Sequence, residues 1–241
     1  MTNITLPKKP KIENLSTIKM LTKGQSDSKA IWDSNKDILM CGSAGTGKSL
    51  LALYFGLEQV LATDNHYNKV IIIRTAVPTQ DMGFLPGEII DKEDPYNAPY
   101  KSIVNHLFNS TDAWDKVIQS GQVQFMTTSY IRGITLDDAV IFVDEIQNMR
   151  YDELRSTITR LGESTRLILA GDTKQTDLQG REAAAAIRGF NKFKAIFDRM
   201  KNTDQIEFKP SDIVRSGRVR DFIITEELYD KEISNDSDNE R

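Results

Sequence analysis

Four short runs of consecutive apolar residues stand out along the chain. They cover residues 38–41 (ILMC), 70–73 (VIII), 140–143 (VIFV) and 167–170 (LILA). Continuous apolar runs, unlike alternating ones, are typical of strands buried on both faces of a parallel sheet. We expect two further strands at residues 122–127 and 206–208, where apolar residues lie among polar ones.

Segments with helical spacing of apolar residues separate these strands. Apolar residues three and four positions apart predict helices over residues 48–62, 151–161 and 183–200. In the last of these, Ile187 and Ile196 are expected to pack together with three phenylalanines. Strands that alternate with helices form βαβ units, so we expect an α/β fold with a mostly parallel, doubly wound sheet flanked by helices.

The two ends of the chain differ in charge. Residues 1–36 contain seven lysines and three acidic residues, whereas residues 226–241 contain seven acidic and two basic residues. The formal net charge of −4 is therefore an average over unlike regions, and it does not exclude a nucleic-acid partner. We expect a basic extended arm over residues 1–15, one domain over 16–228 and an acidic disordered tail over 229–241.

The composition excludes several classes of protein. A single cysteine permits no internal disulfide and no cysteine-rich zinc site. His66 and His106 are far apart in the sequence, so we expect neither to bind a metal. No apolar run approaches the ~18 residues of a membrane-spanning helix, and the first residues lack the apolar segment of a signal peptide. We therefore expect a cytoplasmic protein with no membrane partner.

Residues 80–100 form an unusual segment. They contain three prolines and two glycines, which argues against a regular helix or central strand across most of the segment. The segment nevertheless keeps several apolar and aromatic residues. A long loop with this content is expected to pack against the domain and to be functional.

The segment GSAGTGKS follows the first strand directly and fits the phosphate-binding pattern G-x-x-x-x-G-K-[ST]. In such a loop, backbone N–H groups surround the phosphates, and the next helix adds the positive end of its dipole. Lys48 is expected to reach the β- and γ-phosphates of ATP, and the Ser49 hydroxyl to bind Mg²⁺. The expected nucleotide-binding residues are Gly42, Ser43, Ala44, Gly45, Thr46, Gly47, Lys48 and Ser49.

Polar residues follow two further strands. Asp144 and Glu145 directly follow the run VIFV. We expect the neighbouring strand tip to carry the phosphate loop, and the tips of three strands to bring polar groups to one crevice. A carboxylate at the end of a buried strand is costly unless it meets a cation or donors. We expect Asp144 to hold Mg²⁺ through its water shell and Glu145 to polarise an attacking water. The alternative is that Asp144 caps a helix and Glu145 is a solvated acid of its first turn. Gln175, in GDTKQTDL, carries a neutral donor and acceptor, so its side chain could hydrogen-bond to a γ-phosphate or a water. The alternative is that this segment is an ordinary turn.

These motifs together resemble the PhoH family of P-loop ATPases. The resemblance rests on GSAGTGKS, GFLPGEIIDKEDPYNAPY, VDEIQN, GDTKQTDL and DIVRSGRVR in this order, and it runs from about Thr22 to Thr225. It implies an ATP-hydrolysing, RecA-like core related to superfamily 1 helicases. It also implies a homo-oligomer such as a hexameric ring, and a role linked to RNA. Gln25 resembles the glutamine with which such helicases contact adenine, with a surface residue of an amphipathic helix as the alternative.

The segment DIVRSGRVR raises the question of a catalytic arginine. Arg215 matches the position of the family best, with Arg218 and Arg220 as further candidates, because Ser216 and Gly217 depart from the usual pattern. Phosphoryl transfer needs positive charge near the developing γ-phosphate. Helicases of this type place the nucleotide between two tandem domains, and this chain has one. We therefore expect that Arg215 or Arg218 of one subunit completes the site of the next.

The expected partner is single-stranded nucleic acid, with RNA preferred. Arg74 and Arg132 occupy places where helicase-like cores present groups that contact the strand or a phosphate, and Phe84, Tyr96 and Tyr100 could stack on bases. Solvated arginines and buried loop aromatics are the alternative interpretation. Two other functions also stay open at this point, namely a P-loop kinase of a small molecule and a nucleotide-controlled interaction protein with little turnover.

Overall fold

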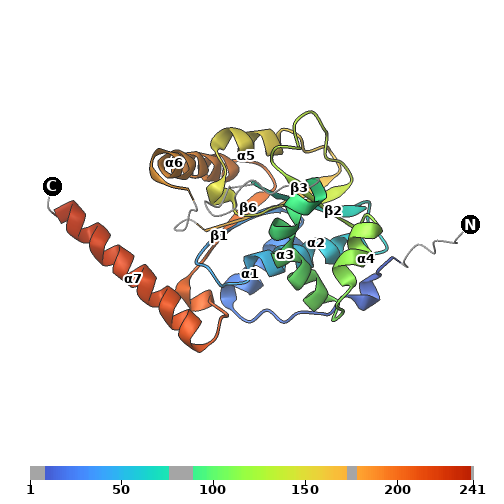
Figure 1. Cartoon of the computed structure of the whole chain (residues 1–241), viewed down its shortest axis with the longest axis horizontal. Helices are drawn as coiled ribbons and strands as arrows, with labels where there is room; N and C mark the ends of the chain where they lie inside the picture. The colour runs from blue at the N-terminus through green and yellow to red at the C-terminus, as the bar shows by residue number, and fades with distance from the viewer. Residues whose placement is uncertain (1–8, 76–88, 173–177, 240–241) are drawn as a thin grey trace, which may run out of the picture.

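The computed structural model describes residues 9–75, 89–172 and 178–239 (Figure 1). Six parallel strands form one sheet in the order β3-β2-β4-β5-β1-β6. All six predicted strands are confirmed, with ends that differ from the prediction by up to three residues. The strands are β1 (Asp37–Gly42), β2 (Lys69–Arg74), β3 (Val123–Thr127), β4 (Ala139–Val143), β5 (Thr165–Gly171) and β6 (Thr203–Phe208).

Helices cover both faces of the sheet, as the continuous apolar runs predicted. Alternate residues of one strand serve opposite cores: Val140 and Phe142 join the core beneath α1 to α4, whereas Ile141 and Val143 join the core with α5 and α6. Figure 1 shows these two layers on either side of the sheet. The helices are α1 (Lys23–Asp33), α2 (Lys48–Leu61), α3 (Ile89–Leu107), α4 (Ala113–Gln119), α5 (Tyr151–Ile158), α6 (Gly180–Phe197) and α7 (Gly217–Asn239). Short 3-10 turns are η1 (Ile12–Asn14), η2 (Ile146–Asn148) and η3 (Pro210–Asp212).

Helix α6 packs through a narrower face than its sequence predicted. Its three phenylalanines are buried, but Ile187 and Ile196 are 43% and 41% exposed. The two isoleucines are nine residues apart and therefore lie on opposite sides of the helix, flanking the phenylalanine stripe. A helix that lies on one face of a sheet buries only that stripe.

The expectation of a loop over residues 80–100 was wrong for its second half. Helix α3 begins at Ile89 and includes Pro95 and Pro99. A proline inside a helix removes one backbone donor and crowds the preceding turn. Helix α3 nevertheless runs through both positions to Leu107. Residues 80–88 of the segment lie outside the described residues.

Both ends of the described chain differ from the expected arm and tail. Helix α7 continues to Asn239, where we expected disorder from residue 229, and Figure 1 shows it projecting from the body. No glycine or proline follows Gly217, which is consistent with one uninterrupted helix. At the other end, the carbonyl of Pro10 accepts a hydrogen bond from Gln122 Nε2 (3.0 Å). The described part of the arm therefore contacts the body.

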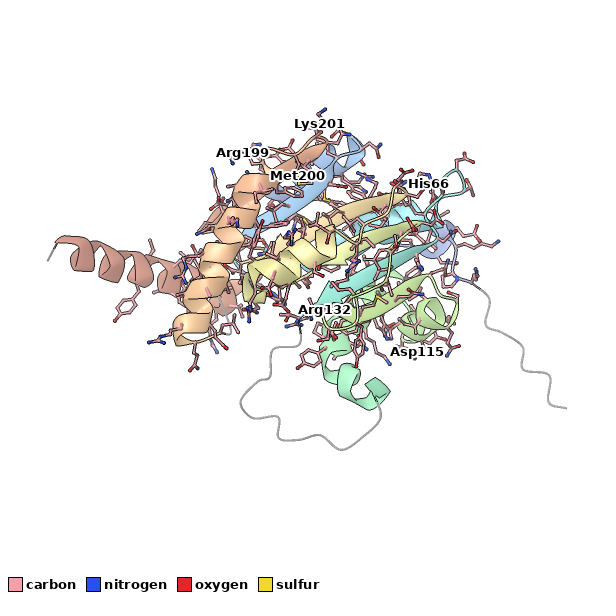
Figure 2. All side chains as sticks on the ribbon, turned by 90° about the horizontal axis from the view of Figure 1, so that it is seen from above. His66, Asp115, Arg132, Arg199, Met200 and Lys201 are labelled. Carbon is pink, nitrogen blue, oxygen red and sulfur yellow. The ribbon has the colours of Figure 1, made fainter. Side chains whose placement is uncertain are left out.

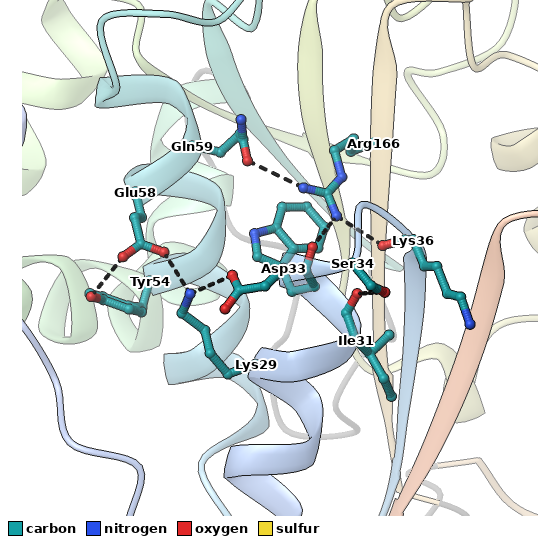
Figure 3. A network of polar contacts seen from close by, with 10 residues as sticks. Lys29, Ile31, Asp33, Ser34, Lys36, Tyr54, Glu58, Gln59 and Arg166 are labelled. Atoms are coloured by element: carbon teal, nitrogen blue, oxygen red, sulfur yellow. Dashed lines mark hydrogen bonds and ion pairs between the residues drawn. The ribbon is translucent and has the colours of Figure 1, made fainter.

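A polar network fixes α1 and α2 at the amino end of the sheet (Figure 3). Arg166 of β5 lies 3.3 Å above the ring of Trp32 and donates to the carbonyls of Trp32 and Lys36 and to Gln59 Oε1. Nearby, Lys29 pairs with both Asp33 and Glu58. These contacts are at the opposite end of the strands from the site described below, and we assign them a structural role.

In the described part of the chain, no helix is both long enough and apolar enough to cross a membrane.

Gly42 joins β1 to the following loop through a contact that excludes any side chain. Its φ is +110°, and a Cβ atom there would lie 2.1 Å from the carbonyl oxygen of Phe208 on β6. Gly121 also has a positive φ (+74°), but a Cβ atom there would meet nothing within 4 Å. Gly42 thus needs glycine for space as well as for conformation.

We predict that Gly42→Ala destabilises the fold more than Gly121→Ala. Both variants carry the conformational strain, and only Gly42→Ala adds the collision with β6. The additional loss should be about 2 kcal/mol, which corresponds to a melting temperature lower by roughly 4–8 °C. Thermal unfolding of the two variants side by side checks this, and equal melting temperatures would contradict it.

Candidate nucleotide-binding site

The carboxyl ends of four neighbouring strands meet beneath one cavity of about 820 Å³. This volume lies within the range of about 300–1,000 Å³ that is usual for sites of small ligands. The last residues of β2 and β5, Arg74 and Gly171, lie in its wall, and the segments that follow β4 and β1 line it from Asp144 and from Ala44 onward. Helix α3 and the segment before α7 complete the wall. The polar and charged lining residues are Thr46, Lys48, Ser49, Arg74, Tyr100, Ser102, His106, Asp144, Glu145, Gln147, Asp172 and Arg215.

The predicted phosphate loop connects β1 to α2, which begins at Lys48. Residues 44–49 of the loop line the cavity, whereas Gly42 and Ser43 are not among its lining residues. Gly45 and Gly47 have φ values of +72° and +89°, which L side chains rarely adopt. The amino end of α2 lies in the cavity wall, and this end of a helix attracts anions. The loop therefore has the form of a phosphate site.

Lys48 is held beneath the loop by two backbone carbonyls. Its Nζ donates to the oxygens of Gly42 (2.7 Å) and Ser43 (2.8 Å). Burial lowers the pKa of Lys48, and the nearby carboxylates of Asp172 and Asp144 partly oppose this effect. An ammonium group carries three donors, so the third can serve a phosphate oxygen.

Asp144 is a buried carboxylate on which three donors converge. Ser49 Oγ and the Tyr100 hydroxyl both donate to Oδ2 (3.1 Å each), and the backbone N–H of Glu145 donates to Oδ1 (3.0 Å). Burial raises the pKa of Asp144 to about 6, with a further contribution from the charge of Glu145, while the three donors oppose the shift. The N-cap position of η2 is occupied by Glu145, so the alternative that Asp144 caps a helix is not supported.

One detail of the predicted arrangement was wrong. The strand that ends at Asp144 is not the neighbour of the phosphate-loop strand, because β5 lies between β4 and β1. The hydrogen bond from Ser49 to Asp144 therefore crosses the end of β5. The tips of β4, β5 and β1 do border one cavity, as predicted, and Asp172 after β5 lines it together with them.

Gln147 fixes Glu145, a role that we did not predict from the sequence. Its Nε2 donates to Glu145 Oε2 (2.5 Å), and its Oε1 accepts from the backbone N–H of Asp172 (2.9 Å). Glu145 itself has a left-handed backbone (φ +52°) and lines the cavity. The only signal in the sequence was the closeness of Gln147 to Glu145 in VDEIQN.

Helix α3 forms the wall opposite the phosphate loop. Tyr100 is 1% exposed, and its ring packs against Phe125 and Phe142 with centroids 5.9 and 6.2 Å away. The expectation that Tyr100 stacks on nucleic-acid bases was therefore wrong, because the ring is buried and its hydroxyl holds Asp144. His106, which we did not expect to bind a metal, also lines the cavity.

Gln25 supports the phosphate loop from behind. Its Nε2 donates to the carbonyl of Thr46 (2.9 Å), and its Oε1 accepts from the backbone N–H of Leu21 (2.8 Å). The residue is buried and is not among those that line the cavity. A contact between Gln25 and adenine would require these bonds to break.

The structure places the predicted arginines differently from one another. A Cβ atom on Gly45 would lie 2.9 Å from Cγ of Arg215, and Arg215 lines the cavity of its own chain. Arg215 therefore borders the site of its own chain, and its action on a neighbouring subunit stays a prediction. Arg218 is exposed and does not line the cavity. Arg74 does line it, and Gln175 lies outside the described residues.

The residues present suit magnesium rather than a protein-caged metal. No group of three or more His, Cys, Asp or Glu residues within the described ranges could hold an ion. Magnesium commonly needs only one or two protein oxygens, because substrate phosphates and water complete its shell. The Ser49 hydroxyl and the Asp144 carboxylate already lie in contact beside the phosphate loop, at 3.1 Å.

Comparison with known proteins shows the family to which the chain belongs. The family described as "PhoH: PhoH-like protein" matches residues 17–227. The chain belongs to this family. A PhoH-like protein of Bacillus subtilis is 32% identical over 219 residues, covering 90% of this chain and 65% of the relative. A PhoH-like protein of Mycobacterium leprae is 30% identical over 195 residues, covering 79% and 53%.

The PhoH-like chain spans less than two thirds of the length of these relatives. Among solved structures, it resembles the large terminase of a thermophilic bacteriophage, with 14% identity, a TM-score of 0.44 and coverage of 82% of this chain and 48% of the terminase. It also resembles the Pif1 helicase of Bacteroides in complex with ADP-AlF3 and single-stranded DNA, with 15% identity, a TM-score of 0.36 and coverage of 79% and 42%. The predicted α/β fold, a parallel sheet flanked by helices with a phosphate loop after β1, is confirmed by the strand order, with one strand between the phosphate-loop strand and the Asp144 strand.

We predict that Asp144→Asn stabilises the metal-free protein more at pH 7.5 than at pH 5. A carboxyl whose pKa is raised from 3.8 to about 6 stabilises the fold below the unfolded pKa, and this stability is lost as pH rises through about 6. The full effect is about 3 kcal/mol, of which about 1 to 1.5 kcal/mol falls between pH 5 and 7.5.

The measurement is thermal unfolding of the variant and the wild type in the presence of EDTA at both pH values. The difference in melting temperature between them should grow with pH. A difference that stays constant between pH 5 and 7.5 would contradict the assigned pKa of Asp144.

Proposed function

We propose that this PhoH-like protein binds Mg²⁺-ATP and hydrolyses it to ADP and phosphate. The observation that carries the proposal is the hydrogen bond between Ser49 of the phosphate loop and Asp144, with Glu145 fixed beside it by Gln147. This arrangement brings a phosphate site, a magnesium site and a candidate base to one cavity. A second carboxylate next to Asp144 favours hydrolysis over simple binding, because an attacking water must lose a proton.

Each residue of the site then has a role. The loop N–H groups and Lys48 bind the β- and γ-phosphates, and Ser49 and Asp144 hold magnesium and its water ligands. Magnesium, when bound, would supply positive charge that neutralises the phosphates. Glu145 accepts a proton from water as the water oxygen bonds to the γ-phosphorus and the bond to the bridging oxygen breaks, which leaves ADP with that electron pair. Gln175 is proposed to orient the water or the γ-phosphate.

Arg215 is the proposed source of positive charge on the side of the phosphate loop. Its position beside Gly45 allows it to act within one chain, without an arginine from a neighbour. The backbone holds this position, because the N–H of Val214 donates to the carbonyl of Gly45 (3.1 Å). Arg218 is exposed on α7 and remains the candidate for action on a neighbouring subunit.

We further propose that the substrate of the motor is single-stranded nucleic acid, preferably RNA, and that the protein forms a homo-oligomer such as a hexameric ring. Arg132 lies in the segment after β3 (Figure 2), two residues after Tyr130, which is 51% exposed. An exposed aromatic ring and a cation in one surface segment suit stacking on unpaired bases. Exposed apolar residues on α7 support a contact between copies; they are Val219, Phe222, Leu228 and Tyr229.

We predict that the wild type releases phosphate from ATP without an added acceptor and does so faster with single-stranded RNA. Lys48→Ala should remove nucleotide binding, and Glu145→Gln should retain binding but lower kcat at least about a hundredfold. Steady-state phosphate release with single-stranded RNA, single-stranded DNA, duplex or no nucleic acid is the measurement. Hydrolysis only with a small-molecule acceptor would indicate a kinase instead. Equal rates with and without every nucleic acid would remove the proposed partner.

We predict that Arg215→Ala abolishes hydrolysis and that a Lys48→Ala subunit cannot restore it. Both residues belong to the site of one chain, so mixing the two variants creates no complete site. Mixing Arg218→Ala with Lys48→Ala tests the other candidate in the same assay. Recovered activity in the Arg215 mixture would contradict action within one chain.

A further inference from the structure

Arg74 ends β2 at a position fixed by the strands on both sides. The carbonyl of the preceding residue, Ile73, accepts a hydrogen bond from the backbone N–H of Asp144 (2.9 Å). On the other side, Arg74 pairs with Thr127 of β3, and its carbonyl accepts from the N–H of Thr128 (3.1 Å). The backbone of Arg74 is therefore held beside Asp144, and its side chain lines the cavity.

The guanidinium of Arg74 lies near several acidic groups, and in the described part of the chain it forms an ion pair with none of them. Burial alone would lower its pKa, but Tyr100, Glu145 and Asp144 outweigh burial and raise it. Within the described ranges, no ion pair to a carboxylate involves Arg74, whereas exposed lysines such as Lys101 do form such pairs. The Tyr100 hydroxyl donates a hydrogen bond to Asp144, so its oxygen can act towards Arg74 only as an acceptor.

The strand order places Arg74 on the far side of Asp144 from the phosphate loop. Strands β2, β4, β5 and β1 follow one another in the sheet, so Arg74 and Lys48 border the cavity from opposite sides of Asp144. Arg215 lies beside Gly45, on the side of the loop. Lys48 also lies within reach of the charge of Glu145, which helps to raise its pKa against burial, but it does so from the side of the phosphate loop. Arg74 borders the cavity from the side of β2, beyond Asp144 and Glu145.

We propose that Arg74 is a catalytic residue that contacts the terminal phosphate of ATP from the side of Glu145, within the same chain. This inference rests on the proposed ATPase function. As water attacks, negative charge spreads over the terminal phosphate oxygens, and two guanidinium N–H groups can bond to two of these oxygens at once. Arg74 stays protonated throughout, because the water proton passes to Glu145 and the leaving electron pair to ADP.

The competing role for Arg74 is structural, as a counter-charge that keeps Asp144 and Glu145 in place. These two roles differ in what they predict for nucleotides that lack the terminal phosphate. A residue that only positions the carboxylates affects ADP and ATP alike, because both nucleotides use the same magnesium site. A residue that touches the terminal phosphate affects ATP alone. Binding of the two nucleotides therefore separates the roles without any measurement of turnover.

The test compares Arg74→Gln and Arg74→Lys with the wild type. The Mg²⁺ complexes of ADP and of a non-hydrolysable ATP analogue are titrated against the full chain, and phosphate release from ATP is measured in parallel. We expect Arg74→Gln to weaken analogue binding about tenfold, to change ADP binding less than about twofold, and to lower kcat about a thousandfold. Arg74→Lys should recover part of the analogue affinity, because it restores the charge but not the two-pronged contact.

The matched control is Arg188→Gln on the exposed side of α6, which should change none of these quantities. Thermal unfolding confirms that each variant is folded. Equal weakening of ADP and the analogue, or an unchanged kcat in Arg74→Gln, would overturn the inference while leaving the ATPase intact. If the wild type does not hydrolyse ATP at all, the proposed function fails. The difference between ADP and the analogue would then still report whether Arg74 contacts a terminal phosphate.

Discussion

The buried carboxylate of Asp144 is the group around which the site is organised. A carboxylate removed from water is stable only when donors or cations surround it. Here a hydroxyl from α2, a hydroxyl from α3 and a backbone N–H supply the donors. These three contacts join the phosphate loop, the wall opposite it and the end of β4. The raised pKa of Asp144 shows that they do not fully offset burial, so a bound cation would gain from this site.

The sheet explains why charge gathers here. In a parallel sheet, all strands end at one edge, and the loops that follow them meet there. A single cavity is therefore lined by three cationic and three acidic side chains, which are Lys48, Arg74, Arg215, Asp144, Glu145 and Asp172. The amino end of α2 adds a further positive potential. A terminal phosphate between these groups would contact cations from the side of the phosphate loop and from the side of β2. The attacking water could reach its phosphorus atom beside Glu145.

The sequence predicted the parts of this arrangement that depend on local pattern. The buried strands were visible as continuous apolar runs, and the phosphate loop was visible because its glycines and Lys48 have fixed spacing. The side chains that join separate elements were harder to predict. Tyr100 lies on a helix that its two prolines concealed, and Gln147 acts through a bond to a backbone N–H 25 residues away. The position of Arg215 in its own site depends on how the chain returns to Gly45, which no local pattern encodes.

The most direct test of this account is a crystal structure of the protein with Mg²⁺, ADP and a fluoride analogue of the transferred phosphate. The account predicts that the Ser49 hydroxyl leaves Asp144 to coordinate the metal, and that Asp144 contacts the water ligands of the metal. It also predicts that Arg74 and Arg215 of the same chain approach the analogue from two sides. A nucleotide bound outside this cavity, or a metal not held by Ser49 and Asp144, would contradict the account.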